Sequence, residues 1–354
     1  MPLSGKHEFL IHDSKDKIYN FYLNEKEEIS CISSNHQRKW TDKENVFEKR
    51  CSSLDIEIDD KDQIHIVSYH YDGDLYYNYK AKEHWKNIQL TKLKRSEKIF
   101  YPKIKTIGKK IHIFYDLQQG NEKERCALFH YTFDEKEKTW ISNNVCTMRF
   151  NKFVNPYKVM SYQNQIIILY TSIVNQKEEL FIVHYDSANN QWGKPQQLTN
   201  SNDRKLYLDG FIDFNGYLHM VWCHYQEENG LTVKYLKSDF KNINFSEKDI
   251  VTLSTQLNCS FPHLVFINKK IYCMWVQFSH LAVVTSGDYG KNWSKPEVES
   301  NSKTKSFKRY RYSVNKPDFK NNLISDFLYG TEYPSIEFLG FGGDQYDEVP
   351  TNES

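Results

Sequence analysis

The sequence has few residues that break or cross-link a chain, and it has no long apolar segment. Its 354 residues include 14 glycines and 9 prolines, and its seven cysteines are scattered without a C-x-x-C pair. This pattern predicts small buried thiols in a reducing compartment, and neither a disulfide framework nor a zinc site. No run of eighteen apolar residues occurs, and residues 1–17 lack the apolar region of a signal peptide. We therefore expect a cytoplasmic protein without a membrane span, while association with a spore or envelope layer stays open.

An excess of one charge is also absent, because 47 Lys and Arg residues balance 46 Asp and Glu residues. One basic run, 303–320, is more typical of a solvated strand edge than of a nucleic-acid site, so we expect no nucleic-acid partner. No P-loop, G-x-G-x-x-G, H-E-x-x-H or G-x-S-x-G motif is present, and we expect no cofactor and no metal. Aromatic residues, in contrast, reach 15% of the chain, which favours β-strands.

A strand pattern recurs six times along the chain, at residues 18–22, 64–68, 111–115, 166–170, 218–222 and 271–275. An aromatic residue closes each unit, and these residues follow one another at intervals of 45 to 55 positions: Trp40, Trp85, Trp140, Trp192, Phe245 and Trp293. A period near fifty with about four strands per period is typical of a β-propeller. The sequence therefore predicts an all-β propeller of four-stranded blades, with six blades favoured and seven as the alternative.

The repeat region occupies residues 1–300, and residues 301–354 depart from the pattern. Residues 306–313 could form a closing strand that pairs the two ends of the propeller. The apolar segment 325–340 is expected to dock either on the propeller or on another subunit, so an oligomer contact through it is possible. The last residues form an acidic tail.

One turn motif stands out in the last unit and has a degenerate copy in the first. The full copy comprises Ser286, Asp288, Gly290 and Trp293, and the partial copy comprises Ser33, Asn35 and Trp40. This motif resembles the Asp-box of sialidase-like propellers, which are also called BNR-repeat propellers. The resemblance implies a structural turn between the third and fourth strands of a blade, on the face away from the substrate. In such a turn Asp288 accepts backbone N–H bonds, Gly290 takes a positive φ, and Trp293 buries its ring while its N–H finds a carbonyl.

The catalytic residues of sialidases are missing from the corresponding positions. That family uses three arginines on the substrate carboxylate, and a Phe/Tyr-Arg-x-Pro motif opens its first strands. Here the comparable entries read Tyr101-Pro102-Lys103 and Phe261-Pro262-His263. Lysine cannot reproduce the bidentate grip of arginine on a carboxylate, so a working sialidase is not expected.

The face opposite the Asp-box turns is the expected ligand-binding face. The second strands end there in an aligned column, and the first strands begin there, which gives the ligand-binding candidates Tyr115, Tyr170, Trp222, Trp275, Tyr101, Lys103 and Tyr157. Aromatic rings surrounded by polar groups are typical of carbohydrate sites. Packing between blades is the simpler interpretation for any single ring of the column. His65, His112 and His219 alternate out of phase with the column and are expected to be packing residues.

Two function classes stay open at this point. The first is a non-catalytic propeller that recognises a carbohydrate or a protein partner on this face. The alternative is a glycoside hydrolase or polysaccharide lyase that uses carboxylates, histidines or tyrosines at the propeller mouth. The weak catalytic candidates are Asp72, Asp116, Asp209, His224 and His263.

Overall fold

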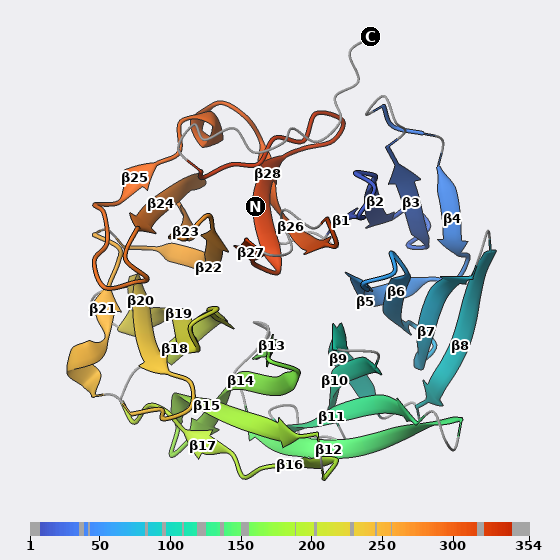
Figure 1. Ribbon diagram of the computed structural model, residues 1–354, viewed down its shortest axis with the longest axis horizontal. Coiled ribbons are helices and arrows are strands. Elements are labelled where there is room, and N and C mark those ends of the chain that lie inside the picture. Colours follow the sequence, from blue (N-terminus) through green and yellow to red (C-terminus); the bar gives the residue numbers. More distant parts are fainter. Residues whose placement is uncertain are drawn as a thin grey trace.

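Six β-sheets, the blades of the propeller, surround a common axis (Figure 1). The computed structural model describes residues 8–34, 39–41, 43–81, 84–93, 97–107, 110–118, 125–134, 138–149, 156–187, 189–201, 204–226, 230–244, 246–255, 257–316 and 322–341. The chain passes from blade to blade in order, and each blade runs from an inner strand beside the axis to an outer strand at the rim. The predicted six-bladed, all-β propeller is confirmed, and the seven-bladed alternative is wrong.

The blades are built from consecutive strands. Blade 1 holds β1 (Phe9–His12), β2 (Ile18–Leu23), β3 (Ile29–Ser33) and β4 (Glu44–Phe47). Blade 2 holds β5 (Cys51–Ile58), β6 (Ile64–His70), β7 (Asp74–Ala81) and β8 (His84–Lys92), and blade 3 holds β9 (Lys98–Ile107), β10 (Lys110–Gln118), β11 (Arg125–Asp134) and β12 (Thr139–Arg149). Blade 4 comprises β13 (Tyr157–Tyr162), β14 (Gln165–Val174), β15 (Lys177–Asp186) and the short strands β16 (Gln191–Trp192) and β17 (Gln196–Gln197).

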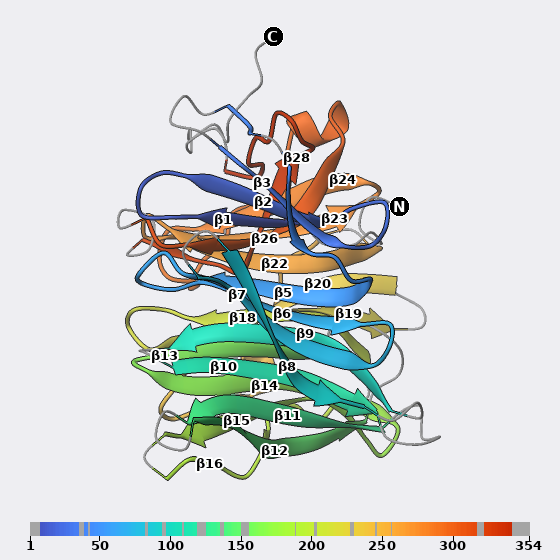
Figure 2. The ribbon, with the colours of Figure 1, turned by 90° about the vertical axis from the view of Figure 1, so that its right-hand side faces the viewer.

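The remaining two blades follow the same plan. Blade 5 comprises β18 (Arg204–Ile212), β19 (Tyr217–Gln226), β20 (Gly230–Asp239) and β21 (Val251–Thr252), with the 3₁₀ turn η1 (Glu247–Asp249) before its last strand. Blade 6 comprises β22 (Cys259–Ile267), β23 (Lys270–Gln277), β24 (His280–Ser286) and β25 (Glu297–Val298), and the 3₁₀ turn η2 (Asn301–Lys303) follows it. Seen from the side, the strands of successive blades lie over one another in layers (Figure 2).

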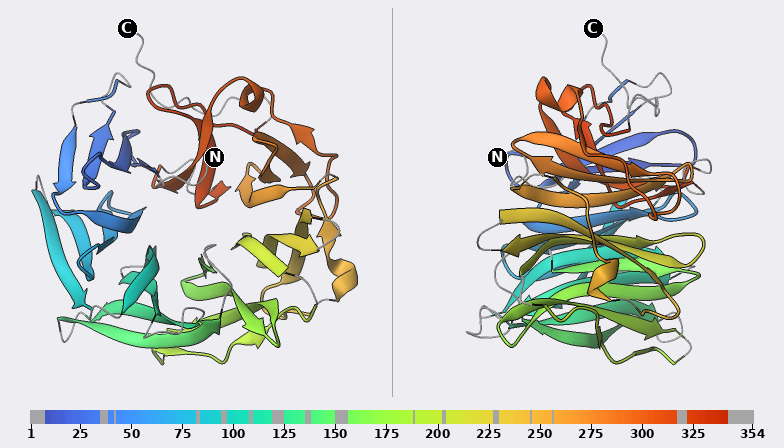
Figure 3. Two further views of the ribbon diagram at one scale, coloured as in Figure 1. Left: turned by 180° about the vertical axis from the view of Figure 1, so that it is seen from behind. Right: turned by 90° about the vertical axis from the view of Figure 1, so that its left-hand side faces the viewer.

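The ring closes by pairing the end of the chain with its beginning. Strand β26 (Phe307–Val314) lies parallel to β1, with Phe9 opposite Arg311, and β28 (Phe327–Thr331) lies antiparallel to β26. Blade 1 therefore contains both the first and the last long strands of the chain, which are blue and red in the view from behind (Figure 3). Parallel pairing between distant segments seals the propeller without leaving the inner edge of β1 exposed.

The apolar strands are buried between neighbouring blades. The cluster between blades 5 and 6, for example, includes Val221, Val233, Tyr235, Ile271 and Trp275, all at most 1% exposed. Because each sheet is covered on both faces, its middle strands are apolar on both sides, as in the fully buried run Ile166 to Leu169 of β14. All seven cysteines are buried and none is part of a disulfide, which confirms the prediction of buried thiols without disulfides.

The two faces of the propeller carry different turns. The turns between first and second strands and between third and fourth strands share one face, called the lower face here. The second-to-third turns and the connections between blades lie on the opposite, upper face. The turn with Ser286 and Asp288 joins β24 to β25 and so lies on the lower face.

The Asp288 turn has the local bonding that the resemblance implies, with one exception. Asp288 Oδ1 accepts bonds from the backbone N–H groups of Lys291 and Asn292, and these bonds and the Asn292 side chain lower the pKa of Asp288 to about 2. Gly290 has a φ of +79°. The Trp293 ring packs edge-on against Tyr235, but its Nε1 has no hydrogen-bond partner among the described residues, so the expected bond to a carbonyl was wrong.

The degenerate first copy is described only in part. Ser33 and Trp40 flank residues outside the described part of the chain, and Asn35 is one of those. The Trp40 Nε1 donates to the carbonyl of Pro334, 3.0 Å away.

The C-terminal segment packs on the propeller of its own chain. After β26 the chain reaches β27 (Leu323–Ile324), which pairs with the lower end of β22, and then crosses to β28 on β26. Beyond β28, Ile336 and Leu339 are buried in the cluster between blades 1 and 6. Residues 323–331 therefore run along the propeller axis from the lower to the upper face.

Candidate functional site

A ring of charged side chains surrounds the axis at mid-height. Each inner strand contributes one residue to what we call the axial ring: Asp55, Lys103, Lys158, Asp209, His263 and Arg311. Side chains alternate between the two faces of a strand, so every second residue faces the axis. Glu57 and Lys105, two residues after Asp55 and Lys103, therefore also face the axis, nearer to the lower face. The inner strands are therefore ionic where they face the axis and apolar where they face the next blade.

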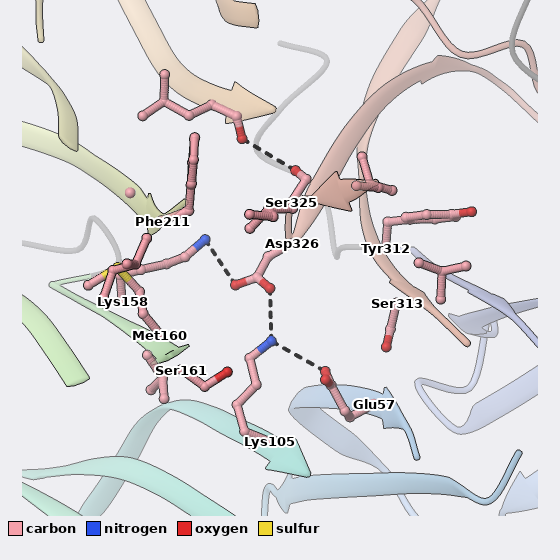
Figure 4. Close-up of a pocket in the computed structure, with 17 residues that line it drawn as sticks. Glu57, Lys105, Lys158, Met160, Ser161, Phe211, Tyr312, Ser313, Ser325 and Asp326 are labelled. Atoms are coloured by element: carbon pink, nitrogen blue, oxygen red, sulfur yellow. Dashed lines mark hydrogen bonds and ion pairs between the residues drawn. The ribbon is translucent and has the colours of Figure 1, made fainter. Parts of the chain in front are cut away.

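The C-terminal segment supplies a central carboxylate to this ring (Figure 4). Asp326 contacts Lys105, Lys158 and Arg311 at 2.8, 2.9 and 2.9 Å, and these cations come from three different blades. Burial alone would raise the pKa of Asp326, but the three cations hold it well below its ordinary value. Asp326 is thus an ionised carboxylate that joins blades 1, 3 and 4 to the segment on the axis.

Two aspartates of the ring also link neighbouring blades. Asp55 contacts Arg311 at 2.8 Å and accepts the backbone N–H of Ile104 in the next blade. Asp209 contacts Lys158 at 2.7 Å and accepts the backbone N–H of Leu264, again in the next blade. These partners keep the pKa of both carboxyls below the ordinary value although burial opposes it.

Asp209, His263 and Ser325 form a relay that looks like the triad of a serine hydrolase. Asp209 Oδ2 lies 2.6 Å from His263 Nδ1, and His263 Nε2 lies 2.7 Å from Ser325 Oγ. However, the same Nε2 lies 2.6 Å from the carbonyl oxygen of Phe327. A carbonyl can only accept, so Nε2 carries a proton and donates it, and it cannot take the proton of Ser325. The relay therefore fastens the axial segment to blades 5 and 6 and does not generate a nucleophile.

The lower half of the axis contains a cavity of about 280 Å³. Charged groups on its wall come from Glu57, Lys105, Lys158 and Asp326, and they point toward one another across the space (Figure 4). Burial raises the pKa of Glu57 although Lys105 and Arg311 oppose the shift. Each charged group on this wall has an opposite charge within 4 Å, so the lower cavity is balanced in charge.

The upper half of the axis has a different charge pattern. The ring of Phe327 lies there with four cations around it, at 5.9 Å from Lys103, 5.8 Å from Lys158, 4.4 Å from Arg309 and 5.4 Å from Arg311. Lys158 and Arg311 are paired with carboxylates, as described above. In the part of the chain that the structure describes, no carboxylate lies within 4 Å of Lys103 or Arg309, and Arg309 Nε has no hydrogen-bond partner.

Three aromatic residues stand at equivalent bulges above the ring. Tyr101, Tyr207 and Phe261 precede the ring residues of their strands by two positions, and each has a positive φ, of 50°, 57° and 51°. The ladder to the second strand slips at each bulge. A bulky side chain is sterically disfavoured in this conformation, which tends to occur where a ligand is held. The rings of Tyr207 and Phe261 are 4.4 Å apart, and Arg309 lies 5.3 Å from Phe261.

The ligand-binding residues predicted from the sequence divide into two groups. Tyr101 lies at the upper mouth and Lys103 lies two residues below it in the axial ring, and both are half-buried. The others are at most 3% exposed and pack in the inter-blade clusters: Tyr115, Tyr157, Tyr170, Trp222 and Trp275. In this structure the aromatic column is therefore part of the core, and a ligand could reach these five residues only after the blades had moved.

The five weak catalytic candidates do not form one site. Asp209 and His263 are in contact within the axial ring. Asp72 is exposed in the upper turn after β6 and pairs with Lys49 at 2.6 Å, and His224 is half-buried near the end of β19. Asp116 is fully buried between blades 3 and 4, and neither of its oxygens has a hydrogen-bond partner in the described structure. Burial raises the pKa of Asp116 well above its ordinary value, which favours the protonated form of its carboxyl.

The expected packing histidines are confirmed for two repeats. His65 Nδ1 lies 2.7 Å from the Tyr77 hydroxyl and His219 Nδ1 lies 2.7 Å from the Tyr235 hydroxyl. Their Nε2 atoms face Asp59 and Asp213, both at 3.3 Å. In blade 3 the buried His112 instead contacts His130.

Sequence reasoning missed the residues that complete the axis. The ring members Asp55 and Lys158 occupy the same position of their inner strands as Lys103 and Asp209, so alignment of the six strands could have found them. The C-terminal segment supplies the others, which lie outside the repeated units and so could not be found by aligning them: Arg309, Arg311, Asp326 and Phe327.

A second cavity, of about 460 Å³, lies between blades 2 and 3. Its wall is mainly aromatic, with Tyr77, Tyr79, Phe133 and Trp140. No group of His, Cys, Asp and Glu suited to a metal ion occurs among the described residues, and no helix there is long and apolar enough to cross a membrane.

The sequence matches no protein-family model and no curated protein. Solved structures do match. The polysaccharide lyase Uly1 superposes with a TM-score of 0.58 at 9% identity, over 98% of this chain and 88% of the lyase. The α-L-arabinanase of Penicillium chrysogenum, solved with arabinobiose, superposes with a TM-score of 0.52 at 11% identity, over 78% of this chain and 92% of the enzyme. A lectin of Aleuria aurantia gives a TM-score of 0.47 at 12% identity, over 82% of this chain and 95% of the lectin. At these identities the shared feature is the propeller fold.

Proposed function

We propose that this chain is a non-catalytic binding protein that takes a carbohydrate at the upper mouth of the axial channel. The observation that carries the proposal is the set of strained aromatic residues Tyr101, Tyr207 and Phe261 around that mouth. Aromatic faces stack on the C–H faces of sugar rings, and the nearby Arg309 guanidinium can donate to hydroxyl or acidic groups. The two matched proteins with TM-scores above 0.5 act on carbohydrates. Their activity is compatible with a carbohydrate ligand here, but it is not evidence for the activity of this chain.

Binding is favoured over catalysis by the state of the axial carboxylates. Hydrolysis needs two carboxyl groups that a substrate can reach, one of them able to hold a proton. Asp55, Asp209 and Asp326 are ionised and engaged in ion pairs, and Asp116 is sealed between blades. Glu57 has a raised pKa, but its carboxylate faces Lys105 at 3.5 Å, and Asp326 on the same cavity wall is held by three cations. The described axial carboxylates therefore stabilise the fold and do not form an acid–base pair.

A second candidate, polysaccharide lyase activity, is favoured by one observation. Burial and the positive charges of Arg311 and Lys158 lower the pKa of Lys103 to about 8, although Asp55 and Asp326 oppose the shift. A lysine with such a pKa can serve as a base near neutral pH. Elimination would produce an unsaturated sugar with a new ultraviolet absorbance, so every saccharide that binds should also be assayed for this product.

The test of the proposed function is a glycan-array screen of the wild-type protein and of variants at the mouth. We expect Tyr207→Ala and Phe261→Ala to weaken binding about 10-fold or more, since each removes a stacking face. Phe214→Ala is the matched control, because Phe214 is 55% exposed on the lower face. Binding that is lost in Trp140→Ala and kept in the mouth variants would move the site to the cavity between blades 2 and 3. A blank array with folded wild-type protein would contradict the proposal and leave a protein partner as the ligand.

A further inference from the structure

The upper mouth contains two cations, Lys103 and Arg309, that form no ion pair with a carboxylate of the described residues. The described inner-strand residues near the axis include five Lys or Arg residues (Lys103, Lys105, Lys158, Arg309 and Arg311) and four carboxylates (Asp55, Glu57, Asp209 and Asp326). Every carboxylate of this set is in an ion pair with Lys105, Lys158 or Arg311. Among the described residues, no carboxylate lies within 4 Å of Lys103 or Arg309, and both cations lie beside the ring of Phe327.

A half-buried cation without a counter-ion has a high cost in free energy, because burial removes its water and nothing replaces it. Lys103 shows this cost as a lowered pKa. Arg309 cannot lose its proton, and its Nε donor is buried without an acceptor. An anion placed between them would supply the missing charge to Lys103 and the missing acceptor to Arg309. The aromatic residues Tyr207 and Phe261 lie beside Arg309, so an attached ring could stack there.

We infer that the saccharide bound at the upper mouth is acidic, and that its carboxylate or sulfate group lies between Lys103 and Arg309. This inference rests on the proposed function and narrows the class of ligand. The acidic group takes the position that Asp326 takes on the lower side of Phe327, where one carboxylate contacts three cations. Neutral saccharides lack the group that these two residues require.

The same geometry predicts how binding depends on pH. Lys103 must be protonated to bind the anion, so affinity is full below a pH of about 8 and falls as the pH rises above it. Four groups face Lys103 from neighbouring elements. Asp55 and Asp326 ionise at much lower pH, Arg311 keeps its charge throughout, and Lys158 is held by two carboxylates. In Lys103→Met the fall in affinity above pH 8 should disappear.

The experiment compares acidic saccharides with neutral partners of the same size by titration calorimetry. One pair is an oligogalacturonate and its methyl ester, and the other is a sulfated oligosaccharide and its desulfated form. We expect one acidic member to bind at least about 10-fold more tightly than its neutral partner, which also tells carboxylate from sulfate. Lys103→Met and Arg309→Met should each weaken that binding about 10-fold or more. Lys110→Met is the control, because Lys110 is exposed and lies at the start of β10 on the lower face.

Three outcomes separate this inference from the proposed function. Equal binding of acidic and neutral partners would overturn the inference and keep carbohydrate binding. If no saccharide binds, the proposed function fails, and inorganic sulfate then tests the anion site alone. Sulfate should raise the Tm of the wild-type protein more than that of the Lys103→Met/Arg309→Met double variant at the same ionic strength. Equal shifts in the two proteins would overturn the anion site.

Discussion

The axial ring and the interface between blades 3 and 4 both bury carboxyl groups, and they treat them in opposite ways. Asp55 and Asp209 on the axis are surrounded by cations and backbone N–H donors, and their pKa values are lowered. Asp116 is equally buried, neither of its oxygens has a hydrogen-bond partner among the described residues, and its pKa is raised. Depth alone therefore does not decide the charge of a buried carboxyl. Partners decide it, because only an opposite charge or a donor can replace the lost water.

Buried carboxyl groups therefore have two different roles in this fold. On the axis, ionised groups hold blades together through ion pairs that join residues of different blades. Between blades, burial without an opposite charge raises the pKa of Asp116, so ionisation of this carboxyl is expected to weaken the interface. Four substitutions test this distinction.

The largest effect is expected for Arg311→Met. This change removes the cation that faces Asp55, Glu57 and Asp326, and it leaves buried negative charge uncompensated. We expect the free energy of unfolding to fall by about 3–5 kcal/mol, measured by urea denaturation at neutral pH. Arg309→Met, two positions along the same strand, is the control and should change it by less than about 1 kcal/mol. If both variants lost the same free energy of unfolding, the ion pairs of Arg311 would not be the cause of the loss.

A smaller loss is expected for Asp209→Asn. The amide keeps an acceptor for Leu264 but breaks the ion pairs with Lys158 and His263, so we expect a loss of about 2–4 kcal/mol at pH 7. The native pKa is lower than the unfolded one, so the contribution of this carboxylate is present above a pH of about 4 and is lost as the pH falls below it. The difference between wild type and variant should therefore shrink in acid unfolding experiments. A difference that does not change with pH would contradict an ionised Asp209.

Asp116→Asn should act in the opposite direction. The native pKa is higher than the unfolded one, so the wild-type protein loses stability as the pH rises above about 4, with a limiting slope of about 1.4 kcal/mol per pH unit. The variant lacks this titration. It should match the wild type near pH 4 and become the more stable protein toward pH 7, as measured by Tm across the pH range. A variant that is less stable at every pH would mean that Asp116 has partners.

The smallest effect is expected for Lys103→Met, which removes a cation that forms no ion pair with the described residues. Without an ion pair to lose, the free energy of unfolding should rise or stay within about 1 kcal/mol of the wild type. Lys158→Met is the matched comparison on the next blade, and it should be clearly destabilising because it leaves Asp209 and Asp326 short of a partner. Urea denaturation of both variants shows whether the loss of stability depends on the ion pairs of the lysine or only on its place in the axial ring.

The sequence allowed the blades to be predicted, because one strand pattern and one closing aromatic recur in each unit. It also placed Lys103, Asp209 and His263 at the mouth of the propeller, and all three belong to the axial ring. For Trp222 and Trp275 it left two interpretations, with packing between blades as the simpler one and ligand binding as the other. The second strand of a blade is covered on both faces, so alternation no longer separates core from surface. The pairs between Arg311 and Asp55 could not be predicted either, since they join residues 256 positions apart through a strand that has no counterpart in the repeat.

The closure of blade 1 has a consequence for synthesis. Strand β1 obtains its inner neighbour only when β26 has been made, about 300 residues later. At roughly 5–20 residues per second, the ribosome needs about 15–60 seconds to reach that strand. During this interval blades 2 to 5 can assemble on one another, while the inner edge of β1 stays open to wrong partners. The last strands to leave the ribosome therefore turn an open row of blades into a closed ring.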